Sequence, residues 1–234
     1  MVLDNKLRFI EGDNMHIELG HTDQINDVAC NLNSGDIVAS VSSDRTCKIW
    51  SFADRQTLQT ISLASAGISV RWHRADNTHL MIAEQSGAIR LYDWTRQERL
   101  WALSLHEAST GLRSGIGPRA GLKCADWRPG NAQCFGALVG SKWCLWNLRE
   151  NHPEQRGEGH AESGGKFRFS PANPRYFASC GGTTLKVYNT SYPQVPQAFP
   201  SPSNVRLRDL SWHATETWLM ACAGDTLYFY VVDG

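Results

Sequence analysis

An internal repeat of 42 residues constrains this chain more than any other feature of its sequence. Five segments each contain a short apolar strand, a small or polar turn and a second strand that ends on an aromatic residue. These segments are 37–50, 80–92, 135–146, 176–188 and 219–230. Their closing aromatic residues are Trp50, Tyr92, Trp146, Tyr188 and Tyr230, spaced by 42, 54, 42 and 42 residues. Five similar units predict one repetitive fold with a single insertion.

A second set of anchors gives the same period. The strand upstream of each unit ends at Cys30, Trp72, Trp127, Phe169 or Trp212, with spacings of 42, 55, 42 and 43 residues. The alternation of apolar and polar residues predicts half-buried strands, and no segment has a convincing helical period. Repeats of about 40–45 residues built from several short strands are typical of WD-repeat propellers. We expect an all-β WD40-repeat β-propeller with five near-complete four-stranded blades plus half a blade, as part of a seven-bladed propeller.

The same spacing sets the expected domain boundaries. Phe9 lies 41 residues before Trp50, so residues 1–19 are expected to be the closing and outer strands of a truncated blade. Residues 20–234 are expected to contain the five WD-type repeats, with a loop insertion near 104–120. We therefore expect a truncated isoform, an incomplete gene model or a cloned fragment of a longer propeller. Its open blade faces should make the isolated chain poorly soluble or dependent on a partner.

Composition limits the classes of partner. The 234 residues are 41% hydrophobic, and 23 basic residues balance 23 acidic ones. Zero net charge argues against broad electrostatic capture of nucleic acid or of anionic lipid. The N-terminus lacks the features of a secretory signal and no apolar run approaches 18 residues, so we expect no membrane insertion. The seven cysteines include no C-x-x-C pair, and we interpret them as reduced packing thiols.

The unit at residues 20–52 carries the full WD-repeat pattern, beginning with Gly-His and closing on tryptophan. Its resemblance to WD-repeat proteins implies a hydrogen-bonded structural tetrad made of His21, Ser40, Asp44 and Trp50. Such a buried chain of polar side chains is stable only when every member has a partner.

A later unit keeps less of this pattern. The dipeptide recurs as Gly159-His160, but Gly182 stands where the tetrad aspartate would be. We therefore expect that blade to be held by apolar packing instead.

A catalytic interpretation of one residue set and a metal-binding interpretation of another are both weaker than the structural interpretation. His21, Asp44 and Ser40 resemble a hydrolase triad in composition, but their repeat positions place them inside a blade, and no G-x-S-x-G elbow accompanies them. His73 and His213 follow equivalent tryptophans in different blades, which disfavours shared metal ligation.

The glycine-containing stretch 115–118 lacks the strand and helix that a dinucleotide-binding loop requires. We expect no catalytic residue, no metal and no cofactor.

Two segments could carry surface contacts. The polar insertion at 104–121 is interpreted as a solvated loop, with a contact loop as the alternative. The segment 191–206 contains four prolines where an outermost strand is expected. Proline there protects an exposed sheet edge, with an extended docking segment as the alternative.

Four segments resemble consecutive blades of one family, in order: 20–52, 65–94, 141–148 and 207–232. The chain resembles the WD-repeat scaffold nucleoporins of the Y-shaped nuclear pore subcomplex, without their N-terminal blades. The resemblance implies a non-catalytic scaffold that docks on other Y-complex nucleoporins, chiefly the large arm subunit, nucleoporin 160. It also implies residence at the nuclear pore complex of the nuclear envelope, a role in pore assembly and in protein and mRNA transport, and kinetochore association in mitosis.

A substrate adaptor of a ubiquitin ligase is the alternative function. Such an adaptor would need a Trp-Asp-x-Arg box, and the nearest candidate, residues 92–96, places its arginine one residue too late. A propeller enzyme is the third class, and it would need ionisable residues that converge at equivalent loops.

Overall fold

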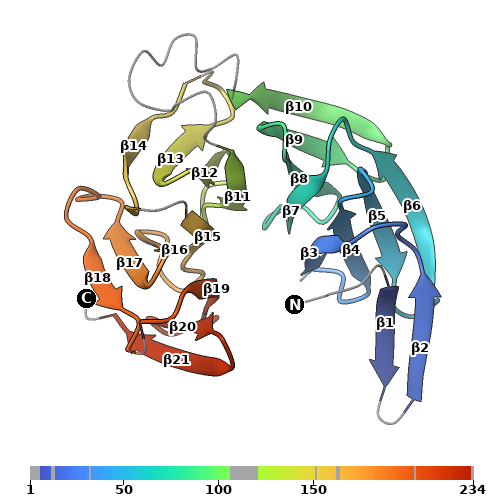
Figure 1. Cartoon of the computed structure of the whole chain (residues 1–234). Coiled ribbons are helices and arrows are strands. Elements are labelled where there is room, and N and C mark those ends of the chain that lie inside the picture. Colours follow the sequence, from blue (N-terminus) through green and yellow to red (C-terminus); the bar gives the residue numbers. More distant parts are fainter. Residues whose placement is uncertain are drawn as a thin grey trace. The chain divides into compact units, whose positions relative to one another are not determined.

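The computed structural model describes residues 6–11, 14–31, 33–105, 121–150, 152–161, 164–202 and 204–232. These residues contain 21 β-strands in six antiparallel sheets, labelled in Figure 1. The all-β prediction is therefore confirmed. The chain divides into two compact units, residues 1–105 and 106–234. Within the described ranges, no helix has the length and apolar character needed to cross a membrane.

The first unit contains one two-stranded and two four-stranded sheets. The two-stranded sheet pairs β1 (Lys6–Glu11) with β2 (Asn14–Leu19). The next sheet has the order β3 (Ile25–Cys30), β4 (Ile37–Ser42), β5 (Thr46–Ser51) and β6 (Gln56–Ser62). The third has the order β7 (Gly67–Trp72), β8 (His79–Glu84), β9 (Ala88–Asp93) and β10 (Glu98–Ser104).

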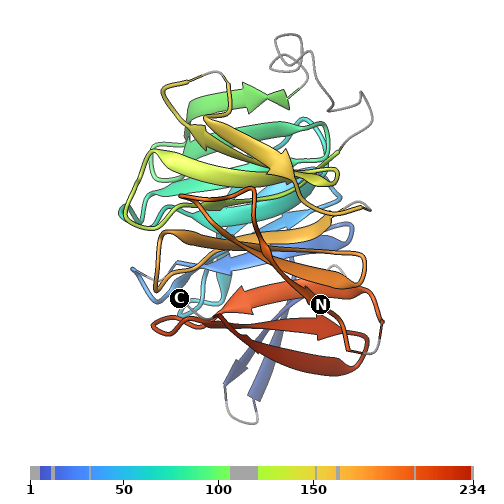
Figure 2. The ribbon, with the colours of Figure 1, turned by 90° about the vertical axis from the view of Figure 1, so that its left-hand side faces the viewer.

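The second unit contains two four-stranded sheets and one three-stranded sheet. The first comprises β11 (Leu122–Trp127), β12 (Cys134–Val139), β13 (Lys142–Asn147) and β14 (Gln155–Glu158). The second comprises β15 (Gly164–Phe169), β16 (Tyr176–Gly181), β17 (Thr184–Asn189) and β18 (Gln197–Pro200). The third comprises β19 (Leu207–Trp212), β20 (Trp218–Ala223) and β21 (Thr226–Val231), shown in red in Figure 2.

The sequence repeat is also a repeat of strand register. In each of these last five sheets the closing aromatic residue lies opposite an apolar residue of the second strand. The pairs are Val38↔Trp50, Leu80↔Tyr92, Phe135↔Trp146, Phe177↔Tyr188 and Leu219↔Tyr230. The anchors and closing aromatics of the sequence therefore mark equivalent places in five equivalent sheets.

A backbone irregularity recurs at the same place in every one of these sheets. The first strand shifts register against the second immediately after its first paired residue. The shifts lie at Ile25/Asp27, Gly67/Ser69, Leu122/Cys124, Gly164/Lys166 and Leu207/Asp209. A β-bulge bends its strand and increases the local twist. The first strand of each of these five sheets, which we call its inner strand, is therefore bent near its beginning in the same way.

Several expectations about loops fall on particular parts of the structure. Residues 106–120, which include most of the insertion and the stretch 115–118, lie outside the described residues. In the proline-containing segment, β18 is the outermost strand of its sheet and ends at Pro200. The preceding Tyr192 and Val195 are 73% and 80% exposed.

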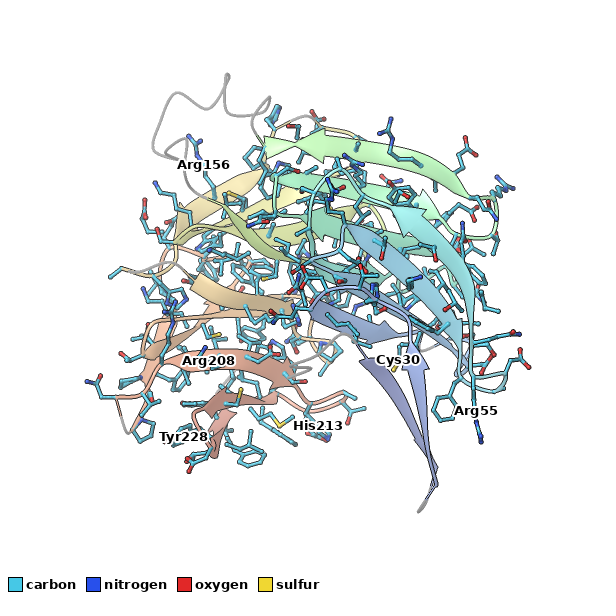
Figure 3. All side chains as sticks on the ribbon, turned by 45° about the vertical axis from the view of Figure 1, so that its right-hand side comes forward. Cys30, Arg55, Arg156, Arg208, His213 and Tyr228 are labelled. Atoms are coloured by element: carbon cyan, nitrogen blue, oxygen red, sulfur yellow. The ribbon has the colours of Figure 1, made fainter. Side chains whose placement is uncertain are left out.

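The cysteines are free thiols, and five of the seven are buried. Cys30, labelled in Figure 3, is exposed at the end of β3, and Cys222 is half-buried. Burial raises the pKa of both Cys144 and Cys180 to about 12, so these thiols stay protonated. Their role in the structure is packing.

An aromatic cluster forms the core between the first two sheets of the second unit. Phe177 of β16 is fully buried and stacks on Tyr188 with ring centroids 4.7 Å apart and planes 7° apart. It also contacts Phe167 of β15 at 5.0 Å and Trp143 of β13 at 5.3 Å. Because β13 belongs to one sheet and β16 to the next, this cluster joins neighbouring sheets.

We predict that Phe177→Ala destabilises the chain by about 3–5 kcal/mol, since it removes a buried ring and leaves a cavity among four other rings. The free energy of unfolding, measured by urea denaturation, checks this. The exposed Tyr192→Ala is the matched control and should change stability little. An equal loss in both variants would contradict the assignment of this core.

Candidate functional site

The structure brings the four predicted tetrad residues together in the sheet of β3–β6. The imidazole of His21, in the loop before β3, lies 2.8 Å from the Ser40 hydroxyl of β4 through Nε2. The indole N–H of Trp50, on β5, donates to the same hydroxyl at 2.8 Å. Ser40 is fully buried, so its oxygen links the entering loop to the closing strand without contacting solvent.

The other side of the imidazole faces the turn between β4 and β5. His21 Nδ1 lies 2.8 Å from Asp44 Oδ2 and 3.1 Å from the Thr46 hydroxyl. The second carboxylate oxygen of Asp44 accepts the Thr46 hydroxyl at 2.7 Å, and the Thr22 amide donates to Oδ2 at 3.0 Å. A carboxylate accepts only, so Nδ1 carries the proton and Nε2 accepts from Ser40.

Burial and hydrogen bonding keep this chain in a defined charge state. Burial lowers the pKa of His21, although the Asp44 carboxylate partly opposes that effect. Burial of Asp44 would raise its own pKa, but hydrogen bonds from Thr46, the Thr22 amide and His21 outweigh it and lower the pKa. The arrangement therefore combines a neutral imidazole with an ionised carboxylate at neutral pH.

Gly20 is required by close packing. A side-chain Cβ at this position would overlap the six-membered ring of Trp50. The Gly-His dipeptide thus combines two needs, because the first residue leaves room for the indole and the second reaches the hydroxyl to which that indole donates.

The sheet of β15–β18 also has a hydrogen-bonded chain, which corrects the expectation of apolar packing alone. His160 Nε2 lies 2.9 Å from the Ser179 hydroxyl, and Nδ1 lies 3.1 Å from the Thr184 hydroxyl. Thr184 in turn donates to the Gly181 carbonyl at 3.1 Å, and the Tyr188 hydroxyl donates to the Gly159 carbonyl at 3.4 Å. This hydrogen-bonded chain therefore ends at a threonine hydroxyl and contains no carboxylate.

The length of the turn explains why the aspartate is absent. Gly182 has φ +56°, the left-handed conformation that Arg45 adopts in the first unit at φ +64°. From the end of the second strand to the start of the third there are four residue steps at Ser42–Thr46, but three at Gly181–Thr184. The shorter turn has no position for the aspartate, and glycine suits its left-handed residue.

The sequence contains a signal for the threonine contact that the comparison of repeats missed. The third strand begins with threonine in both sheets, at Thr46 and Thr184. Both hydroxyls lie 3.1 Å from Nδ1 of the sheet's histidine. Threonine is thus the shared member of the two chains, and the aspartate is the additional one.

The remaining three sheets lack the central hydroxyl. The residues in register with Ser40 and Ser179 are Ile82, Ala137 and Ala221. In the sheet of β7–β10 the fully buried Glu84 lies 3.0 Å from Arg90 Nε and accepts the Ser65 amide at 3.0 Å. A buried ion pair therefore occupies this sheet in place of the histidine chain.

Polar contacts also join neighbouring sheets within each unit. Asp27 of β3 accepts the Val70 amide of β7 at 3.2 Å and pairs with Arg71 at 2.8 Å. The Trp72 indole of β7 also donates to the Ala29 carbonyl of β3, at 2.9 Å. The strand β7 therefore supplies the donors that fix it to β3, which supplies the acceptors.

The second unit repeats these contacts 43 and 44 residues apart. Asp126 of β11 accepts the Phe169 amide of β15 at 2.9 Å. The Trp212 indole of β19 donates to the Arg168 carbonyl of β15 at 3.1 Å. Anchor residues found in the sequence, Phe169 and Trp212, are thus at the contacts between successive inner strands.

The two histidines weighed as metal ligands lie in different units. His73 is near His79, with ring centroids 6.1 Å apart. His213, labelled in Figure 3, stacks on Trp218 at 4.5 Å and accepts the Glu216 amide through Nδ1 at 3.1 Å. Among the described residues, no group of three His, Cys, Asp or Glu side chains is placed to hold a metal ion.

A triad reading of His21, Asp44 and Ser40 conflicts with the position of its hydroxyl. Ser40 Oγ is buried inside the sheet and accepts the Trp50 indole N–H. A nucleophile must reach the substrate carbonyl. The geometry therefore supports packing of the sheet rather than attack on a substrate.

Comparisons with known proteins agree with this architecture. Residues 12–51 match the model of the family described as "WD domain, G-beta repeat". Three similar proteins are each named Nucleoporin Nup37: from Mus musculus, 34% identical over 92% of this chain; from Homo sapiens, 32% over 92%; and from Drosophila melanogaster, 28% over 91%. The chain spans 63% of the length of the mouse and human relatives. The WD40-repeat fold class is confirmed.

We predict that Ser40→Ala lowers the free energy of unfolding by about 1–3 kcal/mol, because it leaves His21 Nε2 and the Trp50 indole N–H buried without their shared partner. Urea denaturation, followed by tryptophan fluorescence, measures the loss. Ser86→Ala, at an exposed turn of the same unit, is the control and should be neutral. A neutral Ser40→Ala would contradict the role of the chain.

The His160 chain predicts a pH dependence of stability. Burial lowers the pKa of His160 to about 4, below the value of about 6.5 in an unfolded chain. Between these values the unfolded state binds the extra proton, so stability is full above about pH 6.5 and is lost as the pH falls toward 4.

The expected contribution of His160 to this loss is at most about 1.4 kcal/mol per pH unit. Urea denaturation at a series of pH values measures it, and His160→Gln should reduce the slope. The exposed His152→Gln should leave the slope unchanged. Equal slopes in the wild type and in His160→Gln would refute the assignment.

Proposed function

Because the chain is homologous to the nucleoporins named Nup37 over 92% of its length, we propose that it is a non-catalytic scaffold nucleoporin. That alignment is the observation that carries the proposal. It runs through all five repeats rather than through one WD unit, which a generic propeller would share. The proposal places the chain at the nuclear pore complex.

The finer assignment concerns its partner. We propose that the chain docks on the large arm subunit of the Y complex, nucleoporin 160, and thereby contributes to pore assembly and to protein and mRNA transport. Association with kinetochores in mitosis would follow from its membership of the same complex. The repeat assignment belongs to this proposal: a half blade at 1–19, and five repeats at 20–234.

The packing supports a scaffold role. The hydrogen-bonded chains of His21 and His160 are buried, and they fix loops and strands within a sheet. The Asp27 and Asp126 contacts fix one inner strand to the next. Rigid elements of this kind can hold a partner at low cost in conformational entropy.

The experiment is affinity purification of the tagged chain from nuclear-envelope extract, followed by mass spectrometry. We expect the Y-complex nucleoporins, with nucleoporin 160 the most abundant. The tag alone and the core variant Phe177→Ala are the controls, since an unstable chain should recover less of the partner.

Two results would contradict the proposal. Soluble, folded chain that recovers no Y-complex subunit would remove the docking assignment. Recovery of the linker subunit of a ubiquitin ligase, in place of nucleoporins, would favour the substrate-adaptor alternative. A Y complex recovered without nucleoporin 160 would retain the scaffold role and exclude the specific partner.

A further inference from the structure

Four cations lie on the inner strands of the three sheets in the second unit. They are Lys123 on β11, Lys166 and Arg168 on β15, and Arg208 on β19. We name them the basic inner-strand group. Lys123 and Arg208 are exposed, and Lys166 and Arg168 are half-buried. Arg208 is labelled in Figure 3.

The three strands are neighbours, so these charges share one region. β15 contacts β11 on one side and β19 on the other. Gly165 of β15 lies at the β-bulge, and a Cβ added there would lie 3.5 Å from Cys180 Sγ and 3.7 Å from the Arg208 carbonyl oxygen of β19. Lys123, Gly165 and Arg208 each lie at the β-bulge of their strand, so the two exposed cations occupy equivalent positions on the strands that flank β15.

Lys166 and Arg168 extend the same region along β15. Residues two apart on a strand lie on one face, so the side chains of Lys166 and Arg168 are on the same side of β15. Arg168 also donates to the Phe167 carbonyl at 2.8 Å, which holds its guanidinium close to the backbone.

The charge of this group is not balanced within the described residues. None of its four members makes an ion pair there, whereas other cations do: Lys142 with Glu158 at 2.7 Å and Arg90 with Glu84 at 3.0 Å. On the inner strands of the first unit, Arg71 is likewise paired with Asp27 at 2.8 Å.

The carboxylates on the same strands have other partners. Asp126 is buried and accepts the amides of Trp127 and Phe169, at 3.0 and 2.9 Å. Asp209 accepts the Leu210 amide at 2.8 Å. These three strands therefore carry four cations but only two carboxylates, and both carboxylates already accept backbone hydrogen bonds.

We propose that the basic inner-strand group binds an acidic, extended peptide segment of a partner protein. Carboxylates would pair with Lys123 and Arg208 on the two flanking strands and with Lys166 and Arg168 on β15 between them. Charge complementarity of this kind sets specificity and the rate of association. The inference does not depend on the nucleoporin assignment.

The surroundings favour carboxylates over nucleic acid. Single-stranded nucleic acid is bound by cations together with aromatic faces on which bases stack. The aromatic residues of these three strands are Trp127, Phe167, Phe169 and Trp212, and all of them are buried. The chain also has zero net charge, so it lacks a wider field for a phosphate backbone.

The test uses the full chain and fluorescence anisotropy with three labelled probes of equal length: poly-glutamate, poly-glutamine and oligothymidylate. We expect poly-glutamate to bind in a salt-dependent manner and the other two to bind much more weakly. The double variant Lys123→Gln with Arg208→Gln should weaken poly-glutamate binding about tenfold.

Two further variants separate charge from folding. Arg149→Gln with Arg175→Gln removes two exposed charges elsewhere in the same unit and should bind as the wild type does. Lys123→Arg with Arg208→Lys keeps the charges and should retain binding. Circular dichroism confirms that each variant is folded.

Four results would overturn the proposal. The first is unchanged binding in the Lys123/Arg208 glutamine variant, and the second is an equal loss in the Arg149/Arg175 control. The third is preferential binding of oligothymidylate, which would identify a phosphate backbone as the ligand. Loss of binding in the charge-conserving variant would also contradict recognition by charge.

Discussion

The structure depends on the burial of strands between neighbouring sheets of the same unit. All six residues of β12 are buried, and β5 and β9 each have buried residues on both faces. A strand covered on both faces leaves no water for its polar groups. A polar group buried there is stabilised by a protein partner, and the hydrogen-bonded chains of His21 and His160 supply such partners to their own members.

These chains also explain why the connecting loops are ordered where they enter a sheet. His21 and His160 precede the inner strand, and each reaches a serine on the second strand 19 residues later. Trp50 adds the third strand to the first chain through the same hydroxyl. One side chain in the loop therefore fixes the positions of two or three strands, so loop and sheet are stabilised together.

The repeat itself could be predicted from the sequence, because the closing aromatics and upstream anchors occupy fixed places in strand register. The first tetrad could be predicted as well, since its four members lie at the spacing of a complete WD unit. The His160 chain could not be predicted from the same comparison. The turn before Thr184 is shorter by one residue and has no aspartate, so Thr184, the counterpart of Thr46, contacts the histidine without an aspartate, and alignment by repeat period sets Gly182 against Asp44.

The inter-sheet contacts were beyond prediction for a different reason. Asp27 and Asp126 accept amides of the next inner strand, yet they occupy different positions relative to the β-bulge, so no single repeat position identifies them. The bulge is a backbone feature, and the residues at it share no side-chain type: Asp27, Cys124 and Lys166 follow it in three of the sheets. Sequence patterns record side chains, and they carry little information about a register shift that many side chains tolerate.

In the sheet of β19–β21, apolar positions that are buried in another sheet are exposed to solvent. Leu227 and Phe229 occupy the places that Cys47 and Ile49 fill on β5, where both are fully buried. On β21 they are 57% and 65% exposed. Exposed apolar residues on alternate positions of an edge strand favour pairing and association. The apolar pattern of the repeat is therefore kept on this strand even where solvent reaches it.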